Sequence, residues 1–157
     1  MSDALRQVAF FVPGIPATKG STRSWVGKKS GRTFTRADSS DALEPWVAKV
    51  ATVAARQWDA PPSDNAIRLD LQFRFTRPRS HYGTGRNAGE LKRSAPEYHI
   101  RKPDRDKLSR AMHDALCGVV YVDDARVFAG LVSKEYGDKP GVHVRVIEYG
   151  RRQAGGR

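Results

Sequence analysis

The sequence predicts a single compact domain of the α+β class, in which a mixed, largely antiparallel sheet packs against two main helices. Residues 67–75 alternate apolar and polar side chains, which is the pattern of a half-buried strand. Residues 40–58 and 104–117 repeat apolar side chains at helical spacing. The chain of 157 residues has the size of one domain, with neither an internal repeat nor a clear linker.

The first expected elements are a strand and a loose hairpin. Residues 6–12 predict the strand because apolar side chains recur at every second position, and the prolines of 13–16 end it. Residues 17–37 are polar and basic. Within them, a glycine-containing turn at 27–31 is flanked by short segments suited to strands, which predicts the hairpin.

The first long helix is predicted to run from a cap at Ser39 or Ser40 to about Trp58. Pro45 falls within its first turns, so the sequence leaves the start open. The prolines of 60–63 separate this helix from the strand at 67–75. Side chains expected to pack into the core from this helix are Leu43, Trp46, Val47, Val50, Val53 and Ala54.

Residues 76–102 differ in character from their surroundings. They hold seven basic residues against two acidic ones and are rich in Gly, Ser and Pro. A long stretch without regular structure inside a compact domain is usually functional or disordered. We expect a mobile basic loop that belongs to a domain spanning residues 1–150.

The last third of the chain predicts a helix followed by two strands. The helix occupies 104–117 and ends at Gly118, which can adopt the left-handed backbone of a helix end. Residues 127–136 and 142–149 predict the two final strands. Residues 151–157 predict a basic C-terminal tail without fixed structure.

Basic residues strongly outnumber acidic ones. Lys and Arg total 28 while Asp and Glu total 17, giving a net charge of +11 and a pI of about 10.2. Such an excess favours binding to polyanions through phosphate contacts and counterion release. The alternatives are a basic protein with no nucleic-acid role, and a membrane surface, for which the sequence lacks a strongly apolar amphipathic helix. The cations expected to contact nucleic acid are Lys19, Arg23, Lys28, Lys29, Arg86, Lys92, Arg93, Arg101 and Lys102.

Cysteine usage and hydropathy point to a cytoplasmic protein. The single cysteine, Cys117, permits neither an internal disulfide nor a CxxC zinc site. No apolar run approaches the length of a membrane span, and the N-terminus lacks a signal-peptide core. We therefore expect neither a membrane partner nor a small-molecule substrate.

Four aspartates bracket the helix at 104–117. Asp104 and Asp106 stand at its start, and Asp123 and Asp124 follow a short apolar run beyond its end. Carboxylate oxygens are the ligands that Mg²⁺ prefers. Such an ion, held between protein and phosphate, can generate a nucleophilic water and stabilise charged oxygens. On a helical wheel Arg110 shares the polar face with Asp106, so it could share charge that develops on a phosphate.

Each of these residues alone also has a purely structural explanation. Asp is a preferred N-cap, and a second Asp in the first turn of a helix complements its dipole. The acidic pair after the helix would be typical of a turn. Arg110 could be a surface residue paired with Asp106 or Asp114. The conjunction of four aspartates around one helix in a basic chain favours a metal site.

The segment 102–124 contains, in order, Asp104-Arg105-Asp106, Arg110, Asp114-Ala115-Leu116 and Asp123-Asp124. This order resembles the motif of the RusA-type Holliday junction resolvases. Two positions depart from the family pattern, because Arg110 stands where Lys is usual and Lys107 where Asn is common. The N-terminal strand, the basic stretch after it and the first helix resemble the phage and prophage branch, so the likeness covers most of the chain.

The resemblance implies a RusA-like fold and an Mg²⁺-dependent endonuclease, with Mn²⁺ as a possible substitute, that cuts Holliday junctions and other branched DNA in recombination and repair. It assigns Asp104, Asp106 and Asp124 as the metal-binding and catalytic carboxylates, with Arg110 beside them. It also implies a homodimer, whose two sites suit the near two-fold symmetry of a four-way junction. If phage-encoded, the protein would act in the cytoplasm of a bacterial host.

Two rival interpretations stay open at this point. The chain could be a nucleic-acid-binding module without catalysis, with the aspartates as caps and salt-bridge partners. It could instead be a metal-dependent nuclease with another preference, such as flaps or RNA. Carboxylate–metal chemistry is alike across phosphodiesterases, so residue types alone do not separate these specificities.

Overall fold

The structure is a computed structural model that describes residues 3–20, 22–37 and 41–151; for 22–23 and 34–37 it describes the backbone alone. The strands are β1 (Ala4–Pro13), β2 (Thr22–Val26), β3 (Thr33–Ala37), β4 (Ala66–Phe75), β5 (Val127–Ala129), β6 (Val132–Tyr136) and β7 (Gly141–Tyr149). The helices are α1 (Leu43–Trp58) and α2 (Arg105–Leu116), with short 3₁₀ helices η1 (Arg79–His81), η2 (Gly85–Asn87) and η3 (Asp124–Arg126).

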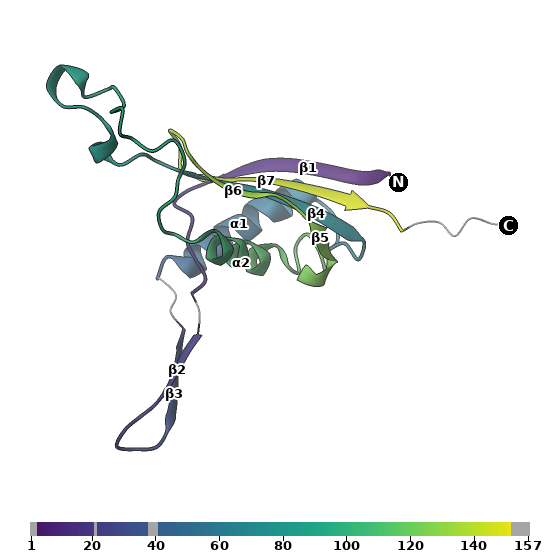
Figure 1. The fold of residues 1–157 in the computed structure, drawn as a ribbon. Coiled ribbons are helices and arrows are strands. Elements are labelled where there is room, and N and C mark those ends of the chain that lie inside the picture. The colour runs from purple at the N-terminus through teal and green to yellow at the C-terminus, as the bar shows by residue number, and fades with distance from the viewer. Residues whose placement is uncertain (1–2, 21, 38–40, 152–157) are drawn as a thin grey trace.

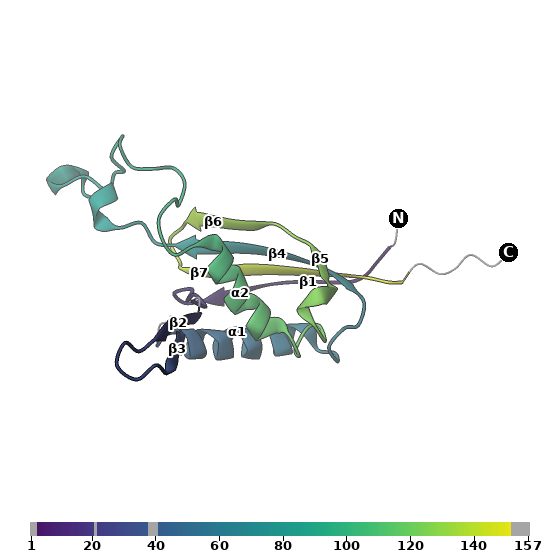
Figure 2. The same ribbon diagram turned by 60° about the horizontal axis from the view of Figure 1, so that its bottom comes forward.

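Five strands form one mixed sheet. β7 lies between β1 and β4 and is antiparallel to both, so Val144 pairs with Phe10 on one side and Leu71 on the other. Beyond β4, the sheet continues with β5 and β6, which run parallel to it. Both helices cover the same face of the sheet (Figures 1 and 2). This arrangement confirms the predicted α+β class with two main helices.

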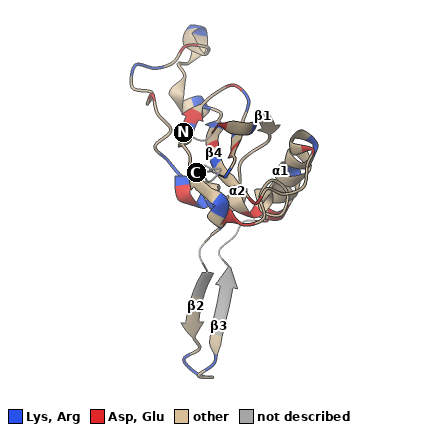
Figure 3. Ribbon diagram, turned by 90° about the vertical axis from the view of Figure 1, so that its right-hand side faces the viewer, with Lys and Arg blue, Asp and Glu red and all other residues tan. Residues whose placement is uncertain are grey.

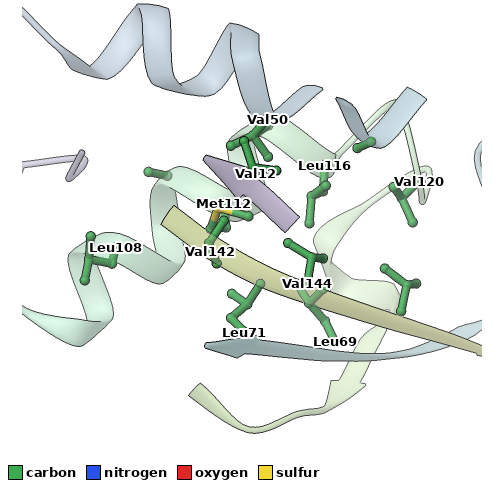
Figure 4. Close-up of a cluster of buried hydrophobic side chains, with 14 of the residues drawn as sticks. Val12, Val50, Leu69, Leu71, Leu108, Met112, Leu116, Val120, Val142 and Val144 are labelled. Atoms are coloured by element: carbon green, nitrogen blue, oxygen red, sulfur yellow. The ribbon is translucent and has the colours of Figure 1, made fainter. Parts of the chain in front are cut away.

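The core lies between that face and the helices. In β4 the apolar members of the alternating pattern turn toward the helices, and Leu69 and Leu71 are almost completely buried. Figure 4 shows these side chains meeting Met112 of α2 and Val144 of β7. Burying each such side chain stabilises the fold by about 1.5–3 kcal/mol. The buried stripe of α2 has the helical spacing that residues 104–117 predict, and it consists of Leu108, Ala111, Met112, Ala115 and Leu116.

Helix α1 begins at Leu43, later than the cap predicted at Ser39 or Ser40. Those two serines lie outside the described residues. Pro45 stands in the first turn, where its missing N–H costs little because that donor has no partner within the helix. The core side of α1 is formed by Trp46, Val50, Ala54 and Trp58, spaced four residues apart.

The prediction of one strand over residues 127–136 is wrong, because the chain bends at Gly130 and Leu131 and forms β5 and β6 instead. Gly130 lies directly against β4, where an added Cβ would stand 1.8 Å from the carbonyl oxygen of Leu69. The N–H of Leu131 donates to Oδ1 of Asp70 at 2.9 Å instead of to a neighbouring strand. These contacts interrupt the hydrogen-bond ladder alongside β4. The sequence of residues 127–136 does not reveal them.

Two basic segments project from the end of the domain at which α2 begins (Figure 1). One is the basic hairpin, residues 22–37, in which β2 and β3 pair as predicted. The other is the basic arm, residues 76–102, which contains η1 and η2. That the arm is mobile stays a prediction, as does the boundary of the domain at residue 150, and residues 152–157 lie outside the described part of the chain.

Aromatic and cationic contacts hold the base of the arm against the sheet. The ring of His99 stacks on Phe75, with ring centroids 4.3 Å apart. The guanidinium of Arg77 lies 4.3 Å from the ring centroid of Tyr136 and donates to the carbonyl of Pro96 at 2.7 Å. These contacts join the beginning and the end of the arm to the same ends of β4 and β6.

Candidate active site

Helix α2 presents two aspartates at its N-terminal end. Asp104 occupies the N-cap position with an extended backbone, yet its side chain makes no capping hydrogen bond with the described residues. The side chain of Asp106 in the first turn is 82 % exposed, and Nε of Arg105 approaches it only to 3.9 Å. The carboxylate of Asp104 is therefore not consumed by helix capping. Asp106 keeps the first-turn place that complements the helix dipole, and its carboxylate stays accessible.

The two aspartates beyond α2, Asp123 and Asp124, differ in their contacts. Oδ1 of Asp123 accepts a hydrogen bond of 2.7 Å from the N–H of Ala125 and so caps η3. Asp124 is the first residue of η3 and is exposed. The structural explanation therefore holds for Asp123, while the side chain of Asp124 remains accessible to a ligand. That Asp124 binds a metal ion stays a prediction.

The three predicted metal ligands do not form a ready-made cage. Asp104 and Asp106 stand at the start of α2, whereas Asp124 follows its end. Within the described residues, no three His, Cys, Asp or Glu side chains are close enough to share a metal ion. Mg²⁺, however, keeps several waters and is usually held by one or two carboxylates together with substrate phosphates. The oxygen donors thus fit this ion in type, with a phosphate needed to complete the site.

The surroundings of the two helix-start carboxylates differ. Asp104 borders a hollow of about 360 Å³ that Lys102 and Lys107 also line, so cations stand beside this carboxylate. Asp106 borders a second hollow of about 260 Å³, lined also by Ser109 and residues 130–132. An anionic group that entered the first hollow would meet two positive charges and one negative charge. This balance favours binding of a phosphate more than the carboxylate by itself would.

Arg110 is not engaged as a surface ion-pair partner. Its two candidate partners pair elsewhere, since Asp114 meets Nζ of Lys19 at 2.7 Å and Asp106 is approached by Arg105. Arg110 is exposed and has no ion pair with any residue in the described part of the chain. The guanidinium one turn from Asp106 is therefore free to bind a phosphate oxygen.

His113 and Tyr121 form a contact that the residue pattern did not reveal. His113 lies on the polar side of α2 but is partly covered, because its Nδ1 stands 2.9 Å from the hydroxyl of Tyr121. Burial lowers the pKa of His113, although the charges of Asp124 and Asp114 oppose the shift, and burial raises the pKa of Tyr121. The bond thus joins a neutral imidazole to a neutral phenol. A usable signal was Tyr121 itself, a polar-tipped side chain within an apolar run.

The predicted DNA-contacting cations lie on both projections and at their roots. Lys28 and Lys29 stand at the tip of the basic hairpin, and Arg86, Lys92 and Arg93 are exposed along the basic arm (Figure 3). The structure does not describe the side chain of Arg23. The remaining three cations lie near the start of α2: Lys19, Arg101 and Lys102.

The end of the arm is fastened next to Asp104. Nζ of Lys134 in β6 donates to the carbonyl of Arg101 at 2.7 Å and to that of Pro103 at 2.9 Å. On the other side, the N–H of Lys19 donates to the carbonyl of Lys107 at 3.2 Å. These hydrogen bonds to main-chain carbonyls place the basic arm and the basic hairpin on either side of the start of α2, where Asp104 and Asp106 lie.

A family model for the endodeoxyribonuclease RusA matches residues 13–147 of this chain. The chain belongs to the RusA endodeoxyribonuclease family. It is also 26 % identical over 144 residues to a protein of Bacillus subtilis (strain 168) named Uncharacterized protein YqaN, and the match covers 90 % of this chain and 96 % of that protein. The RusA match includes α2 and both acidic pairs, so it confirms the resemblance drawn from the residues at 102–124.

Membership of the RusA family assigns the general chemistry. The chain is an endodeoxyribonuclease, a hydrolase of phosphodiester bonds, of a family that acts on DNA junctions and generally depends on divalent metal ions. Among the described helices, none is both long and apolar enough to cross a membrane.

Proposed function

We propose that this protein resolves Holliday junctions and related branched DNA by Mg²⁺-dependent hydrolysis of paired phosphodiester bonds, in DNA recombination and repair. One observation carries the proposal beyond family membership. Asp104, Asp106 and Asp124 are free of capping bonds within the described structure, and they border a helix whose start lies between two basic projections. Exposed carboxylates beside phosphate-binding cations suit a metal-assisted nuclease.

In this proposal, Asp104, Asp106 and Asp124 would supply the carboxylates that hold Mg²⁺, or Mn²⁺ in its place, and the DNA phosphate would complete a site that the described residues do not form by themselves. When bound, the ion activates a water and neutralises charge on the phosphate. Arg110 binds a nonbridging oxygen of the scissile phosphate, where its charge stabilises the transition state. Asp123 keeps its place as the cap of η3 and takes no part in the chemistry.

The basic hairpin and the basic arm bind the DNA. Cations of the basic hairpin and the basic arm contact the phosphate backbone of different segments of the branched substrate. Because the cations lie on separate projections, the protein recognises the branched shape more than a sequence. The participating residues are Lys19, Arg23, Lys28, Lys29, Arg86, Lys92, Arg93, Arg101 and Lys102.

The working unit is proposed to be a homodimer, since two sites related by a two-fold axis could cut a four-way junction symmetrically. The likeness of the N-terminal half to the phage and prophage branch further suggests a role in a bacterial host cell. Both statements are tested directly, by light scattering of the free protein for the dimer and by the genomic neighbourhood of the coding sequence for the origin.

One cleavage experiment separates this function from its rivals. Four-way junction, flap, linear duplex and single-stranded DNA, each end-labelled, are incubated with the full-length protein in Mg²⁺ or in EDTA. We expect paired nicks in the junction with Mg²⁺ and none in EDTA. Binding without cleavage under all conditions would identify a non-catalytic module, and preferential cutting of flaps would identify another nuclease specificity.

A further inference from the structure

A buried side-chain hydrogen bond joins α2 to the segment that carries Asp124. This segment, residues 117–126, is called the acidic turn. Tyr121 within it is completely buried, and its hydroxyl lies 2.9 Å from Nδ1 of His113. The two rings are tilted by 57°, with centroids 6.2 Å apart. The contact is a hydrogen bond between two ring systems that both have little rotational freedom.

The backbone of the acidic turn is attached at two places, the end of α2 and the loop before β4. The N–H groups of Val119 and Val120 donate to the carbonyl of Leu116 at 3.1 and 2.8 Å. The N–H of Ser63 donates to the carbonyl of Val120 at 2.8 Å, and the N–H of Val122 donates to the carbonyl of Ser63 at 3.0 Å. Gly118 starts the turn with φ +80°, and its N–H donates to the carbonyl of Tyr121. These bonds fix the turn relative to the end of α2 and to residue 63, but none of them involves a side chain on the polar face of α2.

The far side of Asp124 has a weaker attachment to the same loop. Nη2 of Arg126 meets Oδ1 of Asp64 at 2.6 Å, and Asp64 also pairs with Arg151. All three side chains are substantially exposed, so solvent screens these pairs and each contributes little. Among the described side-chain hydrogen bonds and ion pairs, the bond from Tyr121 to His113 is the one that joins the acidic turn to α2; Val120 of the turn adds apolar packing in the core.

His113 lies on the same side of α2 as two residues of the proposed site. Asp106, Arg110 and His113 follow at intervals of four and three residues, so they lie along one side of the helix. We propose that the His113–Tyr121 pair is a positioning device, which sets the place of Asp124 relative to the side of α2 that carries Asp106 and Arg110. This inference rests on the proposed function, because it assumes that these residues act on one phosphate. Neither member of the pair touches substrate.

The physical consequence of breaking the link follows from burial. Removing the Tyr121 hydroxyl leaves Nδ1 of His113 without its partner in a partly buried place, and the polar group then turns toward solvent or toward other partners. The acidic turn stays attached to Leu116 and Ser63 through its backbone, but it loses its polar contact with the side of α2 that carries His113. A displacement of about 1 Å at a reacting centre can cost on the order of 100-fold in rate.

The test uses Tyr121→Phe, His113→Leu and His113→Asn in the full-length protein. The amide of Asn places a polar atom near the position of Nδ1, so His113→Asn can keep the bond whereas His113→Leu cannot. Burial keeps His113 neutral near pH 7, so neither substitution removes a charge beside Asp124. Single-turnover cleavage of a four-way junction is measured at saturating protein and Mg²⁺, and junction affinity is measured in EDTA. Hydrogen–deuterium exchange follows the amides of the acidic turn without DNA or metal.

We expect Tyr121→Phe and His113→Leu to slow cleavage by about tenfold or more with unchanged junction affinity, and to accelerate exchange at the amides of Ala125 and Arg126. His113→Asn should recover most of the rate. Val50→Ala, a core change in α1 away from the turn, serves as the control for reduced stability. It should lower the melting temperature and leave cleavage at 20–25 °C unchanged.

Three results would overturn the inference: wild-type exchange in Tyr121→Phe, wild-type cleavage despite faster exchange, or equal losses in His113→Asn and His113→Leu. Failure of the proposed function is distinguishable from these. A wild-type protein that cuts no branched DNA would remove that function, whereas the exchange measurement needs no cleavage and reports on the pair itself.

Discussion

His99 at the end of the basic arm stacks on Phe75 at the end of β4, with ring planes 26° apart and centroids 4.3 Å apart. The stacked ring is nearly buried, and its Nδ1 has no hydrogen-bond partner in the described structure. An imidazole in such a place is stable only when neutral. The arm is thus held to the sheet by a group whose charge state depends on pH.

Acidification should therefore destabilise the folded protein from about pH 6.5 downward. Burial lowers the pKa of His99 and His81, and the charges of Lys134 and Arg77 respectively lower it further. The unfolded chain takes up protons near pH 6.5, whereas the folded chain does so only at lower pH. The free energy of unfolding, measured by urea denaturation, should fall as the pH is lowered through about 6.5, and these histidines should contribute no slope well above that pH. His99→Phe should reduce this slope, and an equal slope in that variant would exclude His99 as a contributor.

Asp104→Asn, Asp106→Asn and Asp124→Asn should each reduce single-turnover cleavage by about 100-fold or more, because each removes an anionic metal ligand worth several kcal/mol. Junction binding should persist or strengthen, since a negative charge beside phosphate is removed. Asp123→Asn is the matched control: its amide oxygen can still accept the bond from Ala125, so cleavage should stay near the wild-type rate. Near-normal cleavage by one of the first three variants would remove that residue from the site.

Arg110→Ala should slow single-turnover cleavage by on the order of 100-fold, if the guanidinium stabilises charge on the scissile phosphate. The free energy of unfolding should change by less than about 0.5 kcal/mol, because Arg110 has no ion pair with the described residues. Arg110→Lys keeps the charge and should retain substantial activity. A full-rate Arg110→Ala protein would leave Arg110 as an ordinary surface residue.

Replacing Arg86, Lys92 and Arg93 together by Ala should weaken junction binding. The slope of log affinity against log salt should become shallower by about 0.9 for each DNA phosphate that the variant no longer neutralises. Lys49, Arg56 and Lys139 are exposed cations outside the two projections, and their joint replacement is the control for net charge. Equal changes in slope for the two triple variants would mean that the arm does not follow the DNA backbone.

Gly130→Ala should destabilise the protein by about 2 kcal/mol or more, because an added Cβ would overlap the carbonyl oxygen of Leu69 and force β5 and β6 away from β4. Gly89→Ala in the basic arm is the matched control, since an added Cβ there meets nothing within 4 Å. Its unfolding free energy should change by less than about 0.5 kcal/mol. Thermal denaturation of both variants, followed by circular dichroism, measures the difference, and similar melting temperatures would contradict the close approach.

The sequence predicts the elements whose burial follows a regular period. The alternation in β4 and the apolar stripe of α2 both reflect contact with one continuous core, so each can be recognised without knowing its partner. The bend at Gly130 depends instead on a close approach to Leu69, and no local pattern records a contact across the fold. The late start of α1 shows a similar limit, because Pro45 is compatible with several helix starts.

In the candidate site, too, some residues can be predicted from the sequence and others cannot. Asp104, Asp106 and Asp124 can be identified from their order along the chain, because they flank a helix with a clear apolar face. The engagement of Asp123 in capping η3, and the burial of His113 by Tyr121, depend on how residues 117–126 fold back on α2. Side chains that meet through a turn of this kind have no fixed spacing, so the contact between His113 and Tyr121 could not be predicted from the sequence.

The two hydrogen bonds from Lys134 have a mechanical consequence for the arm. Nζ of Lys134 holds the carbonyls of Arg101 and Pro103 to β6, immediately before the chain reaches Asp104. A force that DNA exerts on the arm is therefore borne by the sheet before it reaches the helix. If the arm moves, as its composition predicts, this anchor lets it move while the first turn of α2 keeps its orientation. In the proposed complex with DNA, the anchor would separate motion of the arm from the placement of the carboxylates.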